Sequence, residues 1–103
     1  SHIRSTTLES AEEEAFIIDQ AFVGTMIECF VWSPGWTEWL KGYDQMPAYQ
    51  ELRVALQMLQ WQDTSRRGKY WILKSPTHMS APATLLDAFP GALIVQTHRH
   101  PLK

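Results

Sequence analysis

The sequence predicts an α/β fold in which helices are followed by one βαβ unit with parallel strands. Residues 9–63 carry mainly helical patterns, whereas residues 70–73 and 92–97 are short apolar runs rich in strand-forming side chains. A helical pattern over residues 80–89 connects these two runs. Two strands joined by one helix form a parallel pair with a right-handed crossover. We expect residues 1–103 to form a single, partial domain.

The composition excludes several classes of protein. Hydrophobic residues make up 45% and charged residues 19% of the chain, a balance unlike that of a disordered segment. The formal charge of -2 argues against a nucleic-acid partner. No apolar run approaches the roughly 20 residues of a membrane-spanning helix. Because Cys29 is the only cysteine, we expect no intrachain disulfide and a reducing, cytoplasmic location.

The first expected helix follows a capping-box pattern. Ser10 and Glu13 have the spacing at which a serine and a glutamate satisfy each other's backbone amides. The acidic run 12–14 fits the positive end of the helix dipole, and we interpret it as a solvated helix start and not as a catalytic pair. Residues 15–32 are apolar over a wide arc, which predicts a helix that is buried on more than one side.

Two further helices are expected in the first part of the chain. Ser33 and Pro34 are a cap and a first helical residue, and Gly42 is a stop. Residues 47–62 repeat their apolar side chains at helical spacing. The tryptophans of this region are expected to pack in the core. An apolar acceptor pocket lined by Trp36 and Trp39 is the alternative.

Basic side chains follow both predicted strands. The carboxyl ends of parallel strands meet at one edge of a sheet, where open α/β sheets bind ligands. We therefore expect one cationic rim, and this rim predicts a site for phosphate or sulfate groups. Solvated surface residues are the alternative interpretation. The residues of the predicted rim are Lys74, His78, His98, Arg99 and His100.

Three of these rim residues are histidines, which raises the question of a metal. His78, His98 and His100 could together hold Zn²⁺. No cysteine or carboxylate lies close to them in the sequence, and we predict no metal site. A glycine-rich phosphate loop of the GxxxxGK[ST] type is also absent from the sequence.

Three segments of the chain form a recognisable pattern: residues 71–78 (WILKSPTH), 85–90 (LLDAFP) and 94–101 (IVQTHRHP). Together they resemble the PAPS-dependent sulfotransferase family, of the bacterial type with an LKSPxH…THRDP pattern. The resemblance covers the chain from about Ala11 and is that of an internal fragment. It implies a fold related to P-loop kinases, and an activity that moves a sulfuryl group from PAPS to a hydroxyl or amine of a small-molecule acceptor and releases PAP.

The resemblance also implies roles for single residues. Arg99 matches the arginine that binds the 3′-phosphate of PAPS, so residues 98–103 would be a truncated 3′-phosphate-binding segment. His98 and Ser75 are further candidates for binding the donor.

Two other residues lie where the family places its catalytic groups. His78 is the candidate general base on the acceptor hydroxyl. Lys74 is the candidate that stabilises charge on the transferring sulfuryl group.

The sequence departs from the family pattern in ways that affect the expected activity. His100 stands where the family has an aspartate. Lys74 and His78 are four residues apart, whereas the better-known animal enzymes of the family place their catalytic lysine and histidine two residues apart. The 5′-phosphosulfate loop of the family is missing, which predicts a weak or inactive isolated chain. The alternative is a non-catalytic helical module that self-associates or swaps domains through an exposed apolar helix and open sheet edges.

Overall fold

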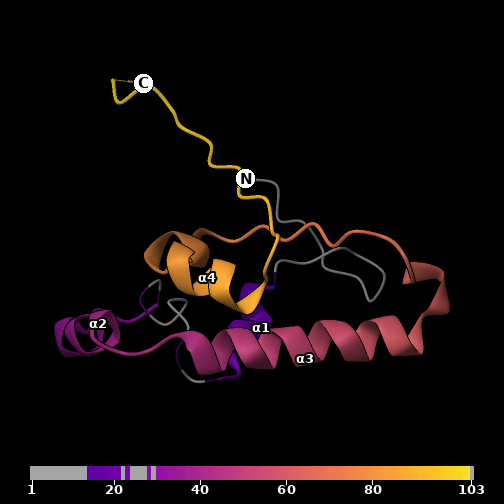
Figure 1. Cartoon of the computed structure of the whole chain (residues 1–103). Helices are drawn as coiled ribbons and strands as arrows, with labels where there is room; N and C mark the ends of the chain where they lie inside the picture. Colours follow the sequence, from indigo (N-terminus) through magenta and orange to yellow (C-terminus); the bar gives the residue numbers. More distant parts are fainter. Residues whose placement is uncertain (1–13, 22, 24–27, 29, 103) are drawn as a thin grey trace.

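The computed structural model describes residues 14–21, 23, 28 and 30–102. Within this part of the chain the regular elements are helical, and α3 is the longest (Figure 1). The segment that connects the longest helix to the last one begins after one short 3₁₀ turn and ends at another. The elements are α1 (Ala15–Asp19), α2 (Pro34–Lys41), α3 (Met46–Gln62), η2 (Thr64–Arg66), η3 (Pro76–Ser80) and α4 (Pro82–Ala88).

Helix α3 organises the fold, because α1, α4 and η2 all contact it. The helix expected over residues 47–62 is confirmed within one residue of each end. Pro47 stands in its first turn, where a missing N–H costs nothing. Its buried side chains follow helical spacing, so they form one face along the helix. They are Ala48, Tyr49, Leu52 and Leu56.

The core lies between this face of α3 and the two shorter helices α1 and α4. Ile18 of α1 and both Leu85 and Ala88 of α4 are buried in the same cluster as Leu52. Arg53 of α3 also donates to the carbonyl of Ala88, which lies at the end of α4, at 3.5 Å. The position of α4 is therefore determined by direct packing on α3.

The expected helix 80–89 is present as α4, and the chain turns directly after it. Gly91 has a φ of 83°, in the left-handed region that favours glycine. The amide of Ala92 donates to the carbonyl of Phe89 at 3.0 Å and closes this turn. The expected helix from Pro34 to a stop at Gly42 is likewise confirmed as α2.

The prediction of one long apolar helix over residues 15–32 is wrong for the described part of that range. Helix α1 ends at Asp19, and residues 31–33 are not helical. Helix α1 has only five residues, too few to be stable alone, and its packing on α3 stabilises it. The predicted cap at Ser10 and Glu13 lies outside the described residues.

The predicted βαβ unit is also wrong: in the described residues 14–21, 23, 28 and 30–102 there is no strand. Residues 69–75 and 92–100 are extended but do not pair, and the second segment leads away from the helices (Figure 1). Parallel strands are stable when helices cover both faces of a sheet, and a sheet of two strands is marginal. Here α4 buries its apolar face against α3 instead, and Trp71 and Leu73 of the first segment pack against this helical core without a strand partner in the described part of the chain. The α/β, P-loop-kinase-like class is therefore not seen.

Across the described residues, none of the helices has both the length and the apolar character that crossing a membrane requires.

Candidate functional site

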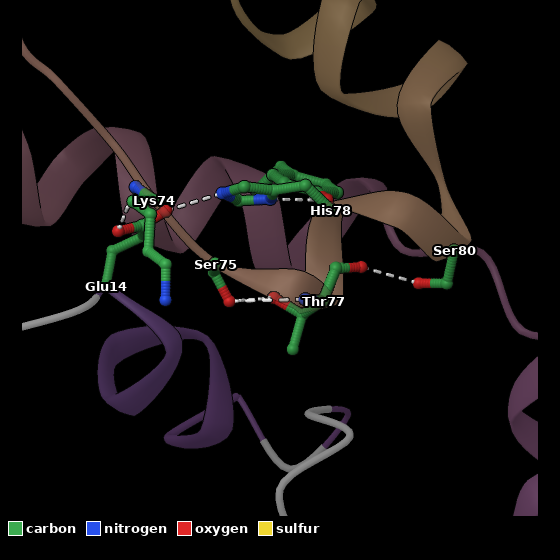
Figure 2. A network of polar contacts seen from close by, with 7 residues as sticks. Glu14, Lys74, Ser75, Thr77, His78 and Ser80 are labelled. Carbon is green, nitrogen blue, oxygen red and sulfur yellow. Dashed lines mark hydrogen bonds and ion pairs between the residues drawn. The ribbon is translucent and has the colours of Figure 1, made fainter. Parts of the chain in front are cut away.

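The turn that begins at Lys74 is held by its own side chains. Ser75 has an extended backbone, and its hydroxyl oxygen accepts a hydrogen bond from the amide of Thr77 at 3.2 Å. The hydroxyls of these two residues are 2.7 Å apart, and Ser80 donates to the carbonyl of Thr77 at 2.7 Å (Figure 2). Pro76 fixes the first position of η3. The sequence SPT thus determines the local path of the chain between Lys74 and His78.

Glu14, at the start of α1, joins this turn to the helical core. One carboxylate oxygen, Oε1, lies 2.6 Å from Nε2 of His78. The other, Oε2, accepts a hydrogen bond from the backbone amide of Lys74 at 3.0 Å. Figure 2 shows the carboxylate reaching up from α1 to both residues. The side chains of Glu14 and His78 are only 6% and 14% exposed, so the pair is largely shielded from water.

Tyr49 of α3 contacts the opposite side of the imidazole. Its hydroxyl lies 3.0 Å from Nδ1 of His78. The two rings are also stacked, with centroids 5.6 Å apart and planes inclined by 29°. Both ring nitrogens of His78 therefore have a partner, one from α1 and one from α3.

The surroundings shift the pKa of both partners of His78. Burial acts to raise the pKa of Glu14, but hydrogen bonds from His78, from its own backbone and from Lys74 outweigh burial, so the pKa lies below the usual 4.5. Burial, together with the negative charge of Glu14, raises the pKa of Tyr49 to about 12. At neutral pH the site therefore contains an ionised carboxylate and a neutral phenol.

The structure brings some of the predicted site residues together and separates others. Lys74, Ser75 and His78 lie in one ordered turn, with the side chain of Lys74 toward solvent. His98 and Arg99 lie in the exposed, extended segment that follows α4. The sequence predicted one rim at the carboxyl ends of two neighbouring strands. Without those strands, the residues of the turn and those of the segment after α4 do not share a sheet edge.

Glu14 is the residue whose place was predicted wrongly. The sequence suggested a solvated helix start, whereas in the structure Glu14 is buried, with an exposed fraction of 6%. A signal was present: Glu14 lies four residues before Ile18, and residues at this spacing share one face of a helix. Ile18 is buried at 4%. Glu14, the last residue of the acidic run 12–14, therefore lies on the apolar face of the helix.

Trp36 and Trp39, considered above as the lining of an acceptor pocket, lie on α2 with their aromatic rings in contact. The rings of Trp36 and Trp39 are tilted by 34° with their centroids 5.0 Å apart, and the ring of Trp39 makes a similar tilted contact with Tyr43 at 4.7 Å. A groove of about 530 Å³ lies between α1 and α3, lined by side chains that include Ile17 and Met58.

The described residues contain no cluster of metal-ligating side chains. No three histidine, cysteine, aspartate or glutamate side chains gather there in a way that could hold an ion. Of the histidines considered for zinc, His78 uses both ring nitrogens within the network described above.

Comparison with known proteins defines the class to which this chain belongs. Residues 2–103 match the family described as the sulfotransferase family. The match covers nearly the whole sequence, and the chain is therefore a member of the sulfotransferase family. No curated protein and no solved structure matches it.

Proposed function

We propose that this chain takes part in the transfer of a sulfuryl group from PAPS to a hydroxyl or amine of a small-molecule acceptor. Membership of the sulfotransferase family over residues 2–103 is the observation that carries the proposal. The ordered turn supports it, because a cationic side chain and an imidazole stand at its two ends, at Lys74 and His78. These are the two kinds of group that sulfuryl transfer requires.

The side chains of the turn and of the C-terminal segment fit an anionic donor. PAPS supplies the activated sulfuryl group and carries phosphates that bind to cations and N–H donors. Residues 92–102 include Arg99 and two histidines and contain no acidic residue. We propose that Arg99 holds the 3′-phosphate of the donor, with His98 and Ser75 as further contacts.

The proposed roles of Lys74 and His78 follow from their chemistry. The ammonium of Lys74 stabilises negative charge that develops while the sulfuryl group moves between two oxygens. His78 takes the proton that the acceptor hydroxyl loses. Reactions of this kind depend on positioning and charge stabilisation, as phosphoryl transfer does. The turn built by residues 75–77 holds the backbone of both residues in place.

The donor site is tested by titrating the full chain with PAP in a calorimeter. We expect micromolar binding, and the variant Arg99→Ala should weaken it about 30-fold, because a charge-assisted contact with a phosphate contributes about 2 kcal/mol. Arg67→Ala is the matched control: Arg67 is exposed, lies in the turn after η2, and should leave binding unchanged. An absence of heat at millimolar PAP would contradict the proposed function.

We further propose that a second copy of the chain is a partner. The extended segments expose large apolar side chains, with Ile72 at 92% and Val95 at 79%. Light scattering over a range of concentrations should show self-association, and the double variant Ile72→Lys/Val95→Lys should reduce it. Trp61→Lys, a change at an exposed residue of α3, is the control. A wild-type chain that is monomeric at every concentration would rule this partner out.

A further inference from the structure

The groups around His78 determine which of its nitrogens carries the proton. An ionised carboxylate can only accept hydrogen bonds, so Nε2 must be the donor in its 2.6 Å contact with Glu14. In a neutral imidazole the other nitrogen, Nδ1, then has the lone pair. The hydroxyl of Tyr49, at 3.0 Å, is placed to donate to it. The hydrogen bond to one ring nitrogen thus decides the chemistry of the other.

We propose that Glu14 is the positioning residue of this site: it fixes His78 with the proton on Nε2 and leaves Nδ1 as the nitrogen that takes a proton. The role of Glu14 goes beyond the histidine, because its second oxygen also holds the amide of Lys74 at 3.0 Å. One buried carboxylate thereby orients both ends of the turn that carries the two proposed catalytic side chains.

This inference rests on the proposed function for its chemical meaning. During transfer, the acceptor oxygen forms a bond to the sulfur of the sulfuryl group, and the bond from that sulfur to the phosphate oxygen of the donor breaks. The proton of the acceptor hydroxyl goes to Nδ1 of His78, and PAP leaves with the electron pair of the broken bond. The resulting imidazolium keeps its proton on Nε2, where it remains hydrogen-bonded to Glu14. The negative charge of Glu14 stabilises the imidazolium.

The same arrangement assigns a role to Tyr49. Its hydroxyl lies within hydrogen-bond distance of Nδ1, the nitrogen that takes the proton from the acceptor. Tyr49 is 3% exposed and remains a neutral phenol at neutral pH, so it donates a hydrogen bond and does not itself act as a base. The acceptor hydroxyl must therefore take the place of the tyrosine hydroxyl at Nδ1. Because that hydroxyl is fixed to its ring, the ring of Tyr49 shifts away with it, and its stacked contact with the imidazole is given up in this step.

The protonation of His78 can be read directly by nitrogen NMR on the full chain at pH 8, without donor or acceptor. We expect a proton on Nε2, a bare Nδ1, and an Nε2–H resonance displaced far downfield by its short bond to a carboxylate. Tyr49→Phe should leave the Nε2 proton in place and change only the shift of Nδ1. Glu14→Gln should move the Nε2–H resonance upfield and speed its exchange with water.

The inference has outcomes that would overturn it. These are a wild-type His78 with its proton on Nδ1, a wild-type His78 with both nitrogens protonated at pH 8, or an Nε2–H resonance that Glu14→Gln leaves unchanged. The wild-type spectrum and Tyr49→Phe decide the question even where Glu14→Gln fails to fold. Failure of the proposed function is seen separately in the PAP titration, which does not involve this resonance.

Discussion

Replacement of Leu52 by alanine should lower the free energy of unfolding by about 3 kcal/mol. Leu52 has no exposed surface and lies on the face of α3 that packs against α1 and α4. The substitution removes buried methyl groups and leaves a cavity that three separate elements would have to close. Urea unfolding followed by circular dichroism gives the free energy directly.

Leu59 provides the matched control for this change, because it lies on the same helix and is 39% exposed. Leu59→Ala should cost about 1 kcal/mol or less, since its side chain loses little buried area. Equal losses for the two leucines would contradict a core centred on Leu52.

Replacement of Glu14 by alanine should lower the free energy of unfolding by about 2 kcal/mol at pH 7. The change leaves the Nε2 proton of His78 and the amide of Lys74 without their shared acceptor. These groups are partly buried, and water only partly replaces the carboxylate. Glu51→Ala is the control: Glu51 is exposed on α3, and its loss should change the free energy by no more than about 0.5 kcal/mol.

The effect of Glu14 should depend on pH in a defined direction. Its pKa in the folded chain lies below the ordinary value of 4.5, so the unfolded chain takes up the proton first as the pH falls. The stabilisation is therefore fully present above about pH 4.5 and is lost as the pH falls through the lowered pKa. Wild type and Glu14→Ala should converge in stability in that acidic range. A difference that stays constant down to pH 2 would contradict a charged Glu14 in the folded chain.

Local patterns predicted the helices α2, α3 and α4. Their starts carry Pro34, Pro47 and Pro82, and the apolar spacing of α3 identified the face that is buried. These signals succeed because capping, proline geometry and helical periodicity act within a few residues of the chain. The extent of the first helix was not predictable in the same way, since α1 is stabilised by its contact with α3.

The candidate site was predicted only in part. The pattern LKSPTH identified Lys74 and His78, and their turn forms as a local motif around Ser75. Glu14 and Tyr49 lie 64 and 29 residues from His78 in the sequence, and no local pattern connects them to it. Their roles became visible only from distances in the folded chain.

The amino-acid sequence was sufficient to predict the family, the positions of three helices and the turn with its two candidate catalytic residues, because each depends on residues that are close together in the chain. Packing between distant segments places α4 on α3, and the apolar segments on either side of α4 form no strand pair with each other. It also brings a glutamate from α1 and a tyrosine from α3 together at His78. Strand pairing and buried polar contacts join distant segments, and their stability depends on what the rest of the fold places beside them.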